Sequence, residues 1–465
     1  MRCHAMYQSI ALSVAAMAFV CCGGRGGGAR DGQAPLDGAS PTDGAPPADG
    51  ALPTDGALPG DSGPQGDGGG SLPPPGCEPL PAATGNVITV SPAEADTLRQ
   101  TVAGAPSGTT ILLEDGTYHL DGGDSLHRLV FSTDGVTLRS ASGNREAVIL
   151  EGGYVTGELV SITASQVTVA DLTLRRAYYH PIHVTGGASG DTVGTRIYNV
   201  HIVDPGEQAI KINPSGQGTF ADHGRVECSH IELTDAGRPE IRNNCYTGGV
   251  DGHQAWGWEV RLNLIEGFWC PIGLSEHAVH FWTGSRDTLT ERNIIRNCAR
   301  GVGYGLGETG SSRAYPDDPY PGVGYMGHID GVIRNNMIFS GIGDSFDTGI
   351  MLDQAHGAIV VHNTVVATSP PFNCIEWRFE NTDVEIKNNL VSHNLMDRGG
   401  TAELQGNLES APLVWFTDGP GGDLHLAPGA GALGTGVALP TGLCDHDLDG
   451  DSRGSPPDVG ADEAH

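Results

Sequence analysis

From about Asn86 onward, the chain is a succession of short apolar runs separated by glycines and polar residues. Apolar and polar side chains alternate within the runs, and helical periodicity never lasts three turns. When similar segments are stacked, a polar corner residue recurs at intervals of 28, 30, 34, 30, 43, 27 and 26 residues. These corner residues are Asp171, Asn199, Ser229, Asn263, Asn293, Asn336, Asn363 and Asn389. Such a repeat, with loops inserted in some turns, predicts an all-β solenoid in which each repeat forms one coil.

Asparagine suits the corner of such a coil for two reasons. It tolerates the left-handed backbone that a tight corner needs, and its amide can bond to the asparagine of the next coil. The β-branched residues after the corner are expected to point inward and to stack at about 4.8 Å per coil. Near the start, Ser91–Ala105 has a capping serine and an amphipathic pattern, which predicts a short helix that caps the open end of the stack.

Three stretches strengthen a resemblance to right-handed parallel β-helix proteins, which extends over residues 86–415. SGTTILLEDGTYHLDG and GVTLRSASGN are similar to the first coils of exported β-helix enzymes, and DHDLDGDSRGSPPDVGADE is similar to a tail of bacterial β-helix proteins. The resemblance implies a single-stranded right-handed parallel β-helix over residues 85–420. A C-terminal tail with an Asp-rich turn is expected over residues 421–465.

The first 22 residues have the pattern of an export signal. Arg2 precedes an apolar run from Ser9 to Val20, which is too short to span a membrane. Cys21 and Cys22 follow at once, and the segment resembles a bacterial lipoprotein signal. We therefore expect an exported chain, either secreted or held at the cell envelope, whose only contact with a membrane is a lipid on Cys21 or Cys22.

Residues 23–84 are expected to form a disordered tether, because they are rich in Pro, Asp and Gly and offer almost nothing to bury. The repeat from Gly23 to Pro75 has seven Asp and two Arg, so it contributes −5 to the net charge of −31, and Arg2 contributes +1. This leaves −27 on residues 77–465. A body this acidic argues against nucleic acid as a partner. It allows neutral glycans, or anionic glycans bound through local Arg or a bridging cation, and we expect a monomer that binds polysaccharide.

Seven cysteines follow the export signal, and they are disulfide candidates in an exported protein. They are Cys77, Cys228, Cys245, Cys270, Cys298, Cys374 and Cys444. No CxxC spacing suggests zinc, and the odd number leaves at least one thiol without a partner in the chain. Cys270 and Cys298 lie one coil apart, and we expect them to form a disulfide.

Alternation along one strand of each coil identifies the side chains that face outward, where solenoids bind their ligands. In AVHFWTG, His280 and Trp282 face outward, and in the next coil Gly303 and Gly305 would leave a bare floor. A Trp beside such a floor, flanked by ionisable groups, suits a sugar subsite. The outward column comprises His183, Lys211, His280, Trp282, a gap at the glycines, Asp353, Glu376 and Arg378. Asn213 also faces outward, two residues after Lys211.

Candidate roles follow from side-chain chemistry. Lys211 is one of only two lysines, and a lysine between apolar residues can have the lowered pKa of a general base. The expected catalytic residues are Lys211, His280, Asp353 and Glu376. The expected substrate-binding residues are His183, Asn213, His253, Trp256, His277, Trp282, Arg286 and Arg378, of which His253 and Trp256 come from an inserted loop.

The stretch SEHAVHFWTGSRDTLTERNIIRNC, residues 275–298, with the following ARG, resembles the chondroitinase B and alginate lyase family in its Asn, Cys and Gly spacing. That family has a lysine nine residues before the Asn and an Arg-His pair after the Cys. Here Gly284 and Gly303–Gly305 stand at those positions, so Lys211, His280 or Arg286 would have to replace them.

Three functions are compatible with these residues. A polysaccharide lyase would use Lys211 or His280 to remove the proton beside a uronate carboxylate. A glycoside hydrolase would use two carboxylates among Glu276, Asp353 and Glu376. A non-catalytic module would bind glycan or serve as a tethered surface scaffold.

The Asp-rich turn offers a possible calcium site and the only cofactor that the sequence suggests. Asp445, Asp447, Asp449 and Asp451 match the first half of a calcium-binding loop. Pro456 stands where such a loop needs a bidentate Glu, so a closing turn without metal is the alternative.

Overall fold

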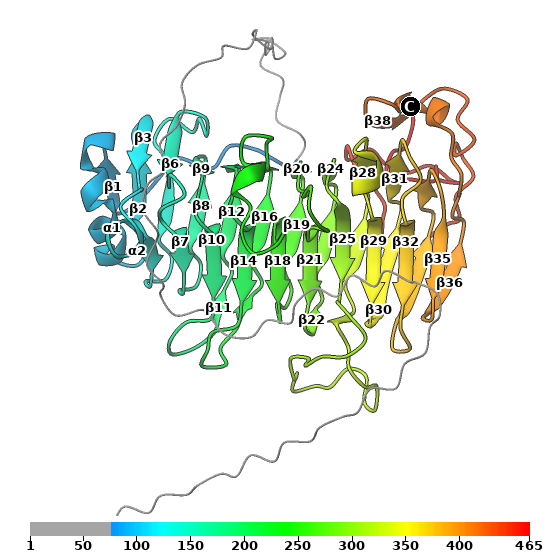
Figure 1. Cartoon of the computed structure of the whole chain (residues 1–465), viewed down its shortest axis with the longest axis horizontal. Helices are drawn as coiled ribbons and strands as arrows, with labels where there is room; N and C mark the ends of the chain where they lie inside the picture. Colours follow the sequence, from blue (N-terminus) through cyan, green and yellow to red (C-terminus); the bar gives the residue numbers. More distant parts are fainter. Residues whose placement is uncertain (1–75) are drawn as a thin grey trace, which may run out of the picture. The chain divides into compact units, whose positions relative to one another are not determined.

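The computed structural model describes residues 76–465, which form a stack of parallel coils (Figure 1). Each coil contributes one strand to each of three sheets, in the order sheet A, sheet B, sheet C; β12, β13 and β14 are one such set. Neighbouring strands within each of the three sheets are parallel. The predicted right-handed parallel β-helix is confirmed.

Sheet A consists of β1 (Val87–Val90), β2 (Thr110–Leu113), β5 (Thr137–Ser140), β8 (Thr168–Ala170), β12 (Arg196–Tyr198), β16 (Arg225–Glu227), β19 (Glu259–Arg261), β22 (Ser285–Arg286), β23 (Leu289–Glu291), β26 (His328–Ile329), β27 (Val332–Arg334), β30 (Ala355–Val361), β33 (Asp383–Lys387) and β36 (Thr401–Gln405). Sheet B consists of β3 (Gly116–His119), β6 (Val148–Glu151), β9 (Thr173–Arg175), β13 (His201–Val203), β17 (His230–Glu232), β20 (Leu264–Glu266), β24 (Ile294–Arg296), β28 (Met337–Ser340), β31 (Thr364–Ala367) and β34 (Leu390–Val391). Sheet C consists of β4 (Leu129–Phe131), β7 (Glu158–Ile162), β10 (His180–Thr185), β14 (Gln208–Asn213), β18 (Gly248–His253), β21 (His277–Trp282), β25 (Arg300–Tyr304), β29 (Thr348–Asp353), β32 (Asn373–Arg378) and β35 (Leu395–Arg398).

The interior of the stack is one continuous apolar core, and a helix covers its first coils. Helix α1 (Ala95–Gly104) follows a capping box between Ser91 and Glu94 and buries Leu98 and Val102. This confirms the helix expected over Ser91–Ala105. The core extends without a break from Val90 to Val391.

The corners contain two adjacent columns of residues. The inner column is a ladder: Asn263, Asn293, Asn336, Asn363 and Asn389 are buried, and each side-chain amide donates to the Asn of the next coil at 2.9–3.0 Å. This confirms the predicted stacking of corner asparagines.

The left-handed backbone belongs to the outer column, one residue before the ladder. Leu262, Arg292 and Asn335, which precede ladder asparagines, have φ between 53° and 58°. By strand register, Asp171 and Asn199 align with this outer column and have left-handed φ themselves, whereas Ser229 aligns with the ladder. The expectation that the ladder asparagines are themselves left-handed was therefore wrong.

The predicted disulfide between Cys270 and Cys298 is wrong. Cys270 bonds to Cys245 instead, with a Cα–Cα distance of 5.6 Å. A second disulfide joins Cys77 and Cys228, with a Cα–Cα distance of 5.7 Å. Cys298 is a buried free thiol whose Sγ faces the backbone oxygens of Ile265 and Arg296. Cys270 lies in the loop outside the coil, whereas Cys298 is in the core, so one coil of separation in sequence did not bring them together.

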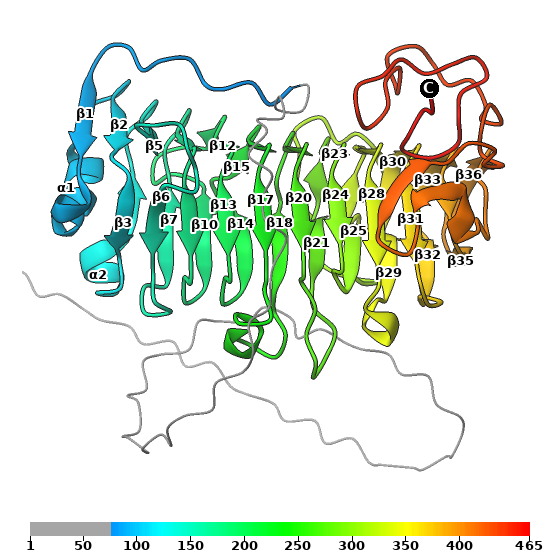
Figure 2. The same ribbon diagram turned by 90° about the horizontal axis from the view of Figure 1, so that it is seen from above.

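The two ends of the described chain lie against the coils. Residues 76–84, which we expected within the tether, are attached to the coils, because Cys77 forms a disulfide with Cys228. In the tail, β37 (Phe416–Asp418) pairs antiparallel with β38 (Asp423–Leu426). Figure 2 shows the C-terminal segment, in red, beside the last coils. The tail buries apolar residues against the outer side of sheet B, where it covers Phe339 and Leu390.

The export signal, Cys21, Cys22 and residues 23–75 of the tether lie outside the described residues. Within residues 76–465, no helix is both long enough and apolar enough to span a membrane.

Mapping of disulfides by mass spectrometry of non-reduced peptides should find Cys77–Cys228 and Cys245–Cys270. Cys298 and Cys374 should be alkylated only after unfolding, because burial raises the pKa of the Cys298 thiol to about 12 and that of Cys374 to about 11. A Cys270–Cys298 peptide would contradict this assignment.

Replacement of one ladder asparagine should destabilise the whole body. Asn293→Ala removes the side-chain oxygen that accepts from the backbone and side-chain amides of Asn263. It also removes the side-chain donor to the buried oxygens of Val260 and Asn336, although Asn336 keeps its bond from the backbone N–H of residue 293. We expect a loss of about 2–3 kcal/mol in the free energy of unfolding, measured with urea, because buried polar groups lose their partners. Asn86→Ala, which removes one bond at an exposed asparagine, is the control; equal losses in the two variants would refute the special role of the ladder.

Candidate functional site

The outer face of sheet C carries a row of aligned positions on successive coils, and most of these positions have ionisable side chains. Strand register places His183, Lys211, Asp251, His280 and Gly303 side by side on β10, β14, β18, β21 and β25. These strands are neighbours in Figure 1. The row then continues through Met351 and Glu376. The alternation seen in the sequence therefore put His183, Lys211, His280 and Glu376 on one line.

Lys211 is the centre of a buried hydrogen-bond network and not a solvent-facing base. Its Nζ donates to the Tyr246 hydroxyl oxygen at 2.7 Å and to Asp251 Oδ2 at 2.6 Å, and it lies 2.9 Å from His253 Nε2. Only 6% of Lys211 is exposed. Burial alone would raise the pKa of Asp251, but Lys211 and His253 hold it well below its ordinary value. With its N–H groups engaged, Lys211 suits a fixed positive charge, and the expected role of general base does not fit this geometry.

His280 and Trp282 are held rigidly next to this network. The two rings stack with centroids 5.4 Å apart, and Trp282 Nε1 donates to Asp251 Oδ1 at 2.8 Å. His280 Nε2 lies 3.0 Å from the Gly305 carbonyl oxygen, so it carries the proton and donates. The His253 ring contacts the Trp282 ring edge-on, with the two centroids 4.2 Å apart. Trp282 is half-buried between these rings, which restricts the face that we expected a sugar to cover.

The expected bare floor at the glycines is filled by the protein. A Cβ on Gly303 would lie 2.7 Å from His277 Nε2, so the imidazole of His277 occupies the space above this glycine. A Cβ on Gly305 would clash with the Asp353 carbonyl oxygen. The floor is therefore not a sugar platform: Gly303 is the position that allows His277 to lie over the strand.

His277, His280 and the neighbouring Glu276 form a compact group. Glu276 Oε2 lies 3.5 Å from His280 Nδ1 and 3.8 Å from His277 Nδ1. Within residues 76–465, neither nitrogen of His277, nor His280 Nδ1, nor Glu276 Oε2 has a hydrogen-bond partner. Burial lowers the pKa of His277 to about 3, and the neighbouring imidazole of His280 disfavours a charge on it as well.

Asp353 and Glu376 form a second buried pair further along sheet C. Arg398 Nη1 donates to both oxygens of Glu376 at 2.9 and 3.1 Å, and Asn373 Nδ2 donates to Oε2 at 2.6 Å. Burial, together with the nearby carboxylate of Glu376, raises the pKa of Asp353 to about 6. Asp353 Oδ2 accepts from the Gly307 N–H at 3.2 Å, while Oδ1 has no hydrogen-bond partner in the described part of the chain.

The other expected substrate-binding residues are divided between two faces. On sheet C, His183 Nδ1 lies 2.7 Å from Glu158 Oε1, Asn213 follows two residues after Lys211, and the Arg378 guanidinium covers the Phe379 ring. Trp256 and Arg286 instead bridge at sheet A, so the structure does not bring them to the row.

Trp256 and Arg286 contact the long loop of residues 305–327, which connects β25 to β26. Arg286 Nη1 donates to Asp317 at 2.6 Å, its guanidinium lies 5.1 Å from the Tyr315 ring, and Trp256 Nε1 donates to Asp287 at 2.9 Å. These contacts fix the loop against the coils, so we no longer expect either residue to bind substrate.

Sequence reasoning missed Tyr246 and undervalued Asp251. Asp251 lies on β18, where alternation alone would have placed it between Lys211 and His280 in the row. Tyr246 lies in an irregular loop and was not recoverable from periodicity. The Cys245–Cys270 disulfide fixes that loop one residue away from it.

The Asp-rich turn does not gather its carboxylates. Asp447 Oδ1 accepts from the N–H groups of Asp449, Gly450 and Asp451, and Oδ2 accepts from Glu463 N. Asp445 accepts from Gly442 N, while Asp449 and Asp451 lie beside His425 and His465 respectively. The four carboxylates thus have separate partners, which fits a closing turn better than the calcium site that we considered.

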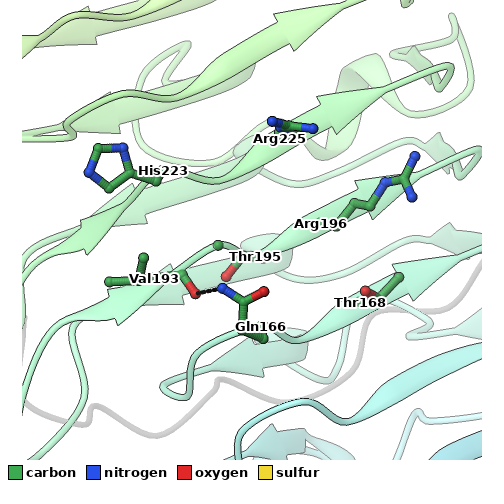
Figure 3. A pocket seen from close by; sticks show the side chains of 8 residues that line it. Gln166, Thr168, Val193, Thr195, Arg196, His223 and Arg225 are labelled. Carbon is green, nitrogen blue, oxygen red and sulfur yellow. Dashed lines mark hydrogen bonds between the residues drawn. The ribbon is translucent and has the colours of Figure 1, made fainter. Parts of the chain in front are cut away.

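A cavity of about 390 Å³ lies away from the row, on sheet A (Figure 3). It is lined by Gln166, Thr168, Val193, Gly194, Thr195, Arg196, His223 and Arg225. Arg196 is paired with Glu227, and Gln166 Nε2 donates to the Val193 oxygen, so its polar groups are largely engaged within the protein. A second cavity of about 570 Å³ lies in the tail, next to His425 and Asp462.

No protein-family model matches the chain, and no curated protein matches it. Solved structures share its fold. The crystal structure of pectate lyase Pel9A has a TM-score of 0.53 at 15% identity, and the match covers 82% of this chain and 97% of that one. A mutant of the PL6 family alginate lyase AlyGC has a TM-score of 0.45 at 13% identity, covering 69% and 47%. PfbA, a surface adhesin of Streptococcus pneumoniae, has a TM-score of 0.43 at 11% identity, covering 68% and 88%. At these identities the likeness extends to the fold alone.

The buried carboxyl of Asp353 makes stability depend on pH. Its folded-state pKa of about 6 lies above the ordinary 3.8, so its contribution to stability is complete below pH 4 and is lost as the pH rises through 6. The native chain should therefore lose stability relative to Asp353→Asn as the pH rises. The difference in the free energy of unfolding between the two proteins should change by about 3 kcal/mol from pH 4 to pH 7, in favour of the variant. Urea unfolding across this range tests it. Asp383→Asn, at an exposed position, should show no such trend, and a pH-independent difference for Asp353→Asn would contradict the shift.

Proposed function

We propose that this protein acts on a polysaccharide at the outer face of sheet C, as a lyase of uronate-containing chains. The observation that carries the proposal is the bond between the Lys211 ammonium and the Tyr246 hydroxyl oxygen. A row of polar groups repeated coil by coil suits an extended polymer better than a small molecule. The fold shared with pectate lyase Pel9A supports polysaccharide as the substrate class to test.

Tyr246 is the best-placed group for proton transfer. It is half-buried, so it reaches the surface, whereas Lys211, Asp251 and His280 are buried. The ammonium that donates to its oxygen stabilises negative charge there, and a fixed cation costs no reorganisation during the reaction. The Cys245–Cys270 disulfide holds the loop in place.

The proposed elimination needs one proton carrier. Tyr246, as a phenolate, takes the proton from the carbon beside the uronate carboxylate. The electron pair of that bond forms a carbon–carbon double bond as the glycosidic C–O bond breaks. The phenol then returns the proton to the leaving oxygen, so the products are an unsaturated uronate and a new reducing end.

Tyr246→Phe should remove this activity without removing the fold. The full chain would be incubated with alginate, pectate, chondroitin and neutral glycans, and ultraviolet absorbance and reducing ends would be followed together. A loss of about 10²- to 10⁴-fold in the absorbance rate is expected, as for other general acid–base groups. Tyr320→Phe, at the sheet A loop, is the matched control and should keep full activity. Undiminished absorbance in Tyr246→Phe would refute this role, and binding without cleavage would favour a glycan-binding module.

Asp353 and Glu376 support a second candidate, a glycoside hydrolase. A carboxyl with a raised pKa near a second carboxyl group that accepts from Arg398 is the kind of pairing that such enzymes use as acid and base. This reaction would give reducing ends without absorbance, and Glu376→Gln would abolish it while Tyr246→Phe would not.

A further inference from the structure

We infer that Glu276, His277 and His280 form a binding site for a divalent transition-metal ion of the zinc type. One ligand atom from each residue lies within 4.8 Å of the other two. The inference concerns metal binding itself and does not depend on the proposed lyase reaction.

The spacing of the ligand atoms fits a tetrahedral shell. Ligands about 2.0–2.1 Å from zinc at tetrahedral angles are about 3.4 Å apart. The distances from Glu276 Oε2 are 3.5 Å to His280 Nδ1 and 3.8 Å to His277 Nδ1. These distances are longer than a good N–H···O hydrogen bond, so the three groups converge without bonding to one another.

The three groups also have a reason to bind something. His277 and His280 are 1% exposed, and their Nδ1 atoms have no partner within residues 76–465. A buried polar atom without a partner costs about 1–3 kcal/mol, and several such atoms meet at this one point. A metal ion would satisfy both Nδ1 atoms and Glu276 Oε2 at once, and of the atoms without a partner in this group only His277 Nε2 would remain.

The surroundings orient the ligands as metal sites require. A metal-binding histidine usually donates its other ring N–H to a carbonyl or carboxylate, which fixes the tautomer. His280 Nε2 donates to the Gly305 carbonyl at 3.0 Å and so turns the lone pair of Nδ1 toward Glu276. Gly303 leaves room for His277, because any side chain there would displace its ring.

Two other groups of potential ligands in the described chain lack these features. In the group of His201, His230 and Glu232, His201 lies 3.0 Å from Glu146 and 2.8 Å from Glu232, and His230 lies 2.8 Å from Glu266. In the group of His425, Asp449 and Asp462, both ring nitrogens of His425 face carboxylates. Their ligand atoms are already hydrogen-bonded, so these groups are explained as ion-pair networks.

The ligand set indicates the metal and leaves a place for another ligand. Two imidazoles with one carboxylate suit zinc, cobalt, nickel or copper and not calcium, which prefers oxygen. Three protein ligands leave a fourth position open, as in zinc sites that bind water or substrate. Glu276 is 12% exposed and follows an exposed loop that contains Ile272, so this side of the group is nearest to solvent.

Metal binding can be measured directly on the full chain. After treatment with a chelator and dialysis, Zn²⁺ would be titrated by calorimetry, and Co²⁺ would be added to follow the visible absorption of a low-symmetry site. We expect one tight equivalent in the native chain. Affinity should fall at least 100-fold in His280→Ala and 10-fold or more in Glu276→Gln, which keeps the size of the side chain and guards against misfolding.

His201→Ala, in the first of the two alternative groups, is the matched control and should bind the metal as the native chain does. Circular dichroism would verify that each variant keeps its sheets. The inference is overturned if the native chain binds neither Zn²⁺ nor Co²⁺, if His280→Ala and Glu276→Gln retain native affinity, or if Ca²⁺ competes equally for the site. Because binding is read without substrate, a failure here leaves the lyase assay unaffected, and an inactive protein that binds metal separates the two proposals.

Discussion

Everything in this body depends on the register of one coil on the next. The buried ladder from Asn263 to Asn389 fixes it, because each amide bonds to the asparagine of the following coil. A slip of one residue would break every bond of the ladder and would turn the outward row of sheet C toward the core. The same corners serve a second purpose on the outside. Asn335 and Asn388, in the left-handed column, donate to the backbone of the tail and hold it against the last coils.

The polar row on sheet C is costly for a scaffold and therefore informative. A solenoid needs only apolar residues inside and solvent-exposed polar residues outside. Lys211, Asp251 and His280 fit neither description, because they are polar and buried. Their bonds to each other and to Tyr246 recover part of the cost of burial, but the unpaired atoms of Glu276 and His277 do not recover theirs. Such unsatisfied groups are typical of places where a protein binds or transforms another molecule.

The sequence predicted what periodicity controls. Alternation identified the outward residues Lys211, His280 and Glu376, and the repeat of corner asparagines predicted the coils. Periodicity could not predict the contacts between loops. The Cys245–Cys270 pairing and the position of Tyr246 depend on the path of an inserted loop, and that loop is not part of the repeat. Periodicity also gives the direction of a side chain but not its surroundings. Gly303 was correctly placed on the outer face, yet only the structure shows that a ring from the preceding strand, His277, occupies the space above it.

The last coil ends in strands that have a partner on one side only. β36 pairs with β33, and β35 pairs with β32, so each presents an open parallel edge that a second molecule could extend. On β36, Leu404 is 49% exposed, and the side chain of Glu403 is 64% exposed. Two such ends meet as like-charged surfaces, because the body is strongly acidic. Repulsion between these ends opposes a continuation of the coils of one molecule into the next, and rising ionic strength weakens that repulsion.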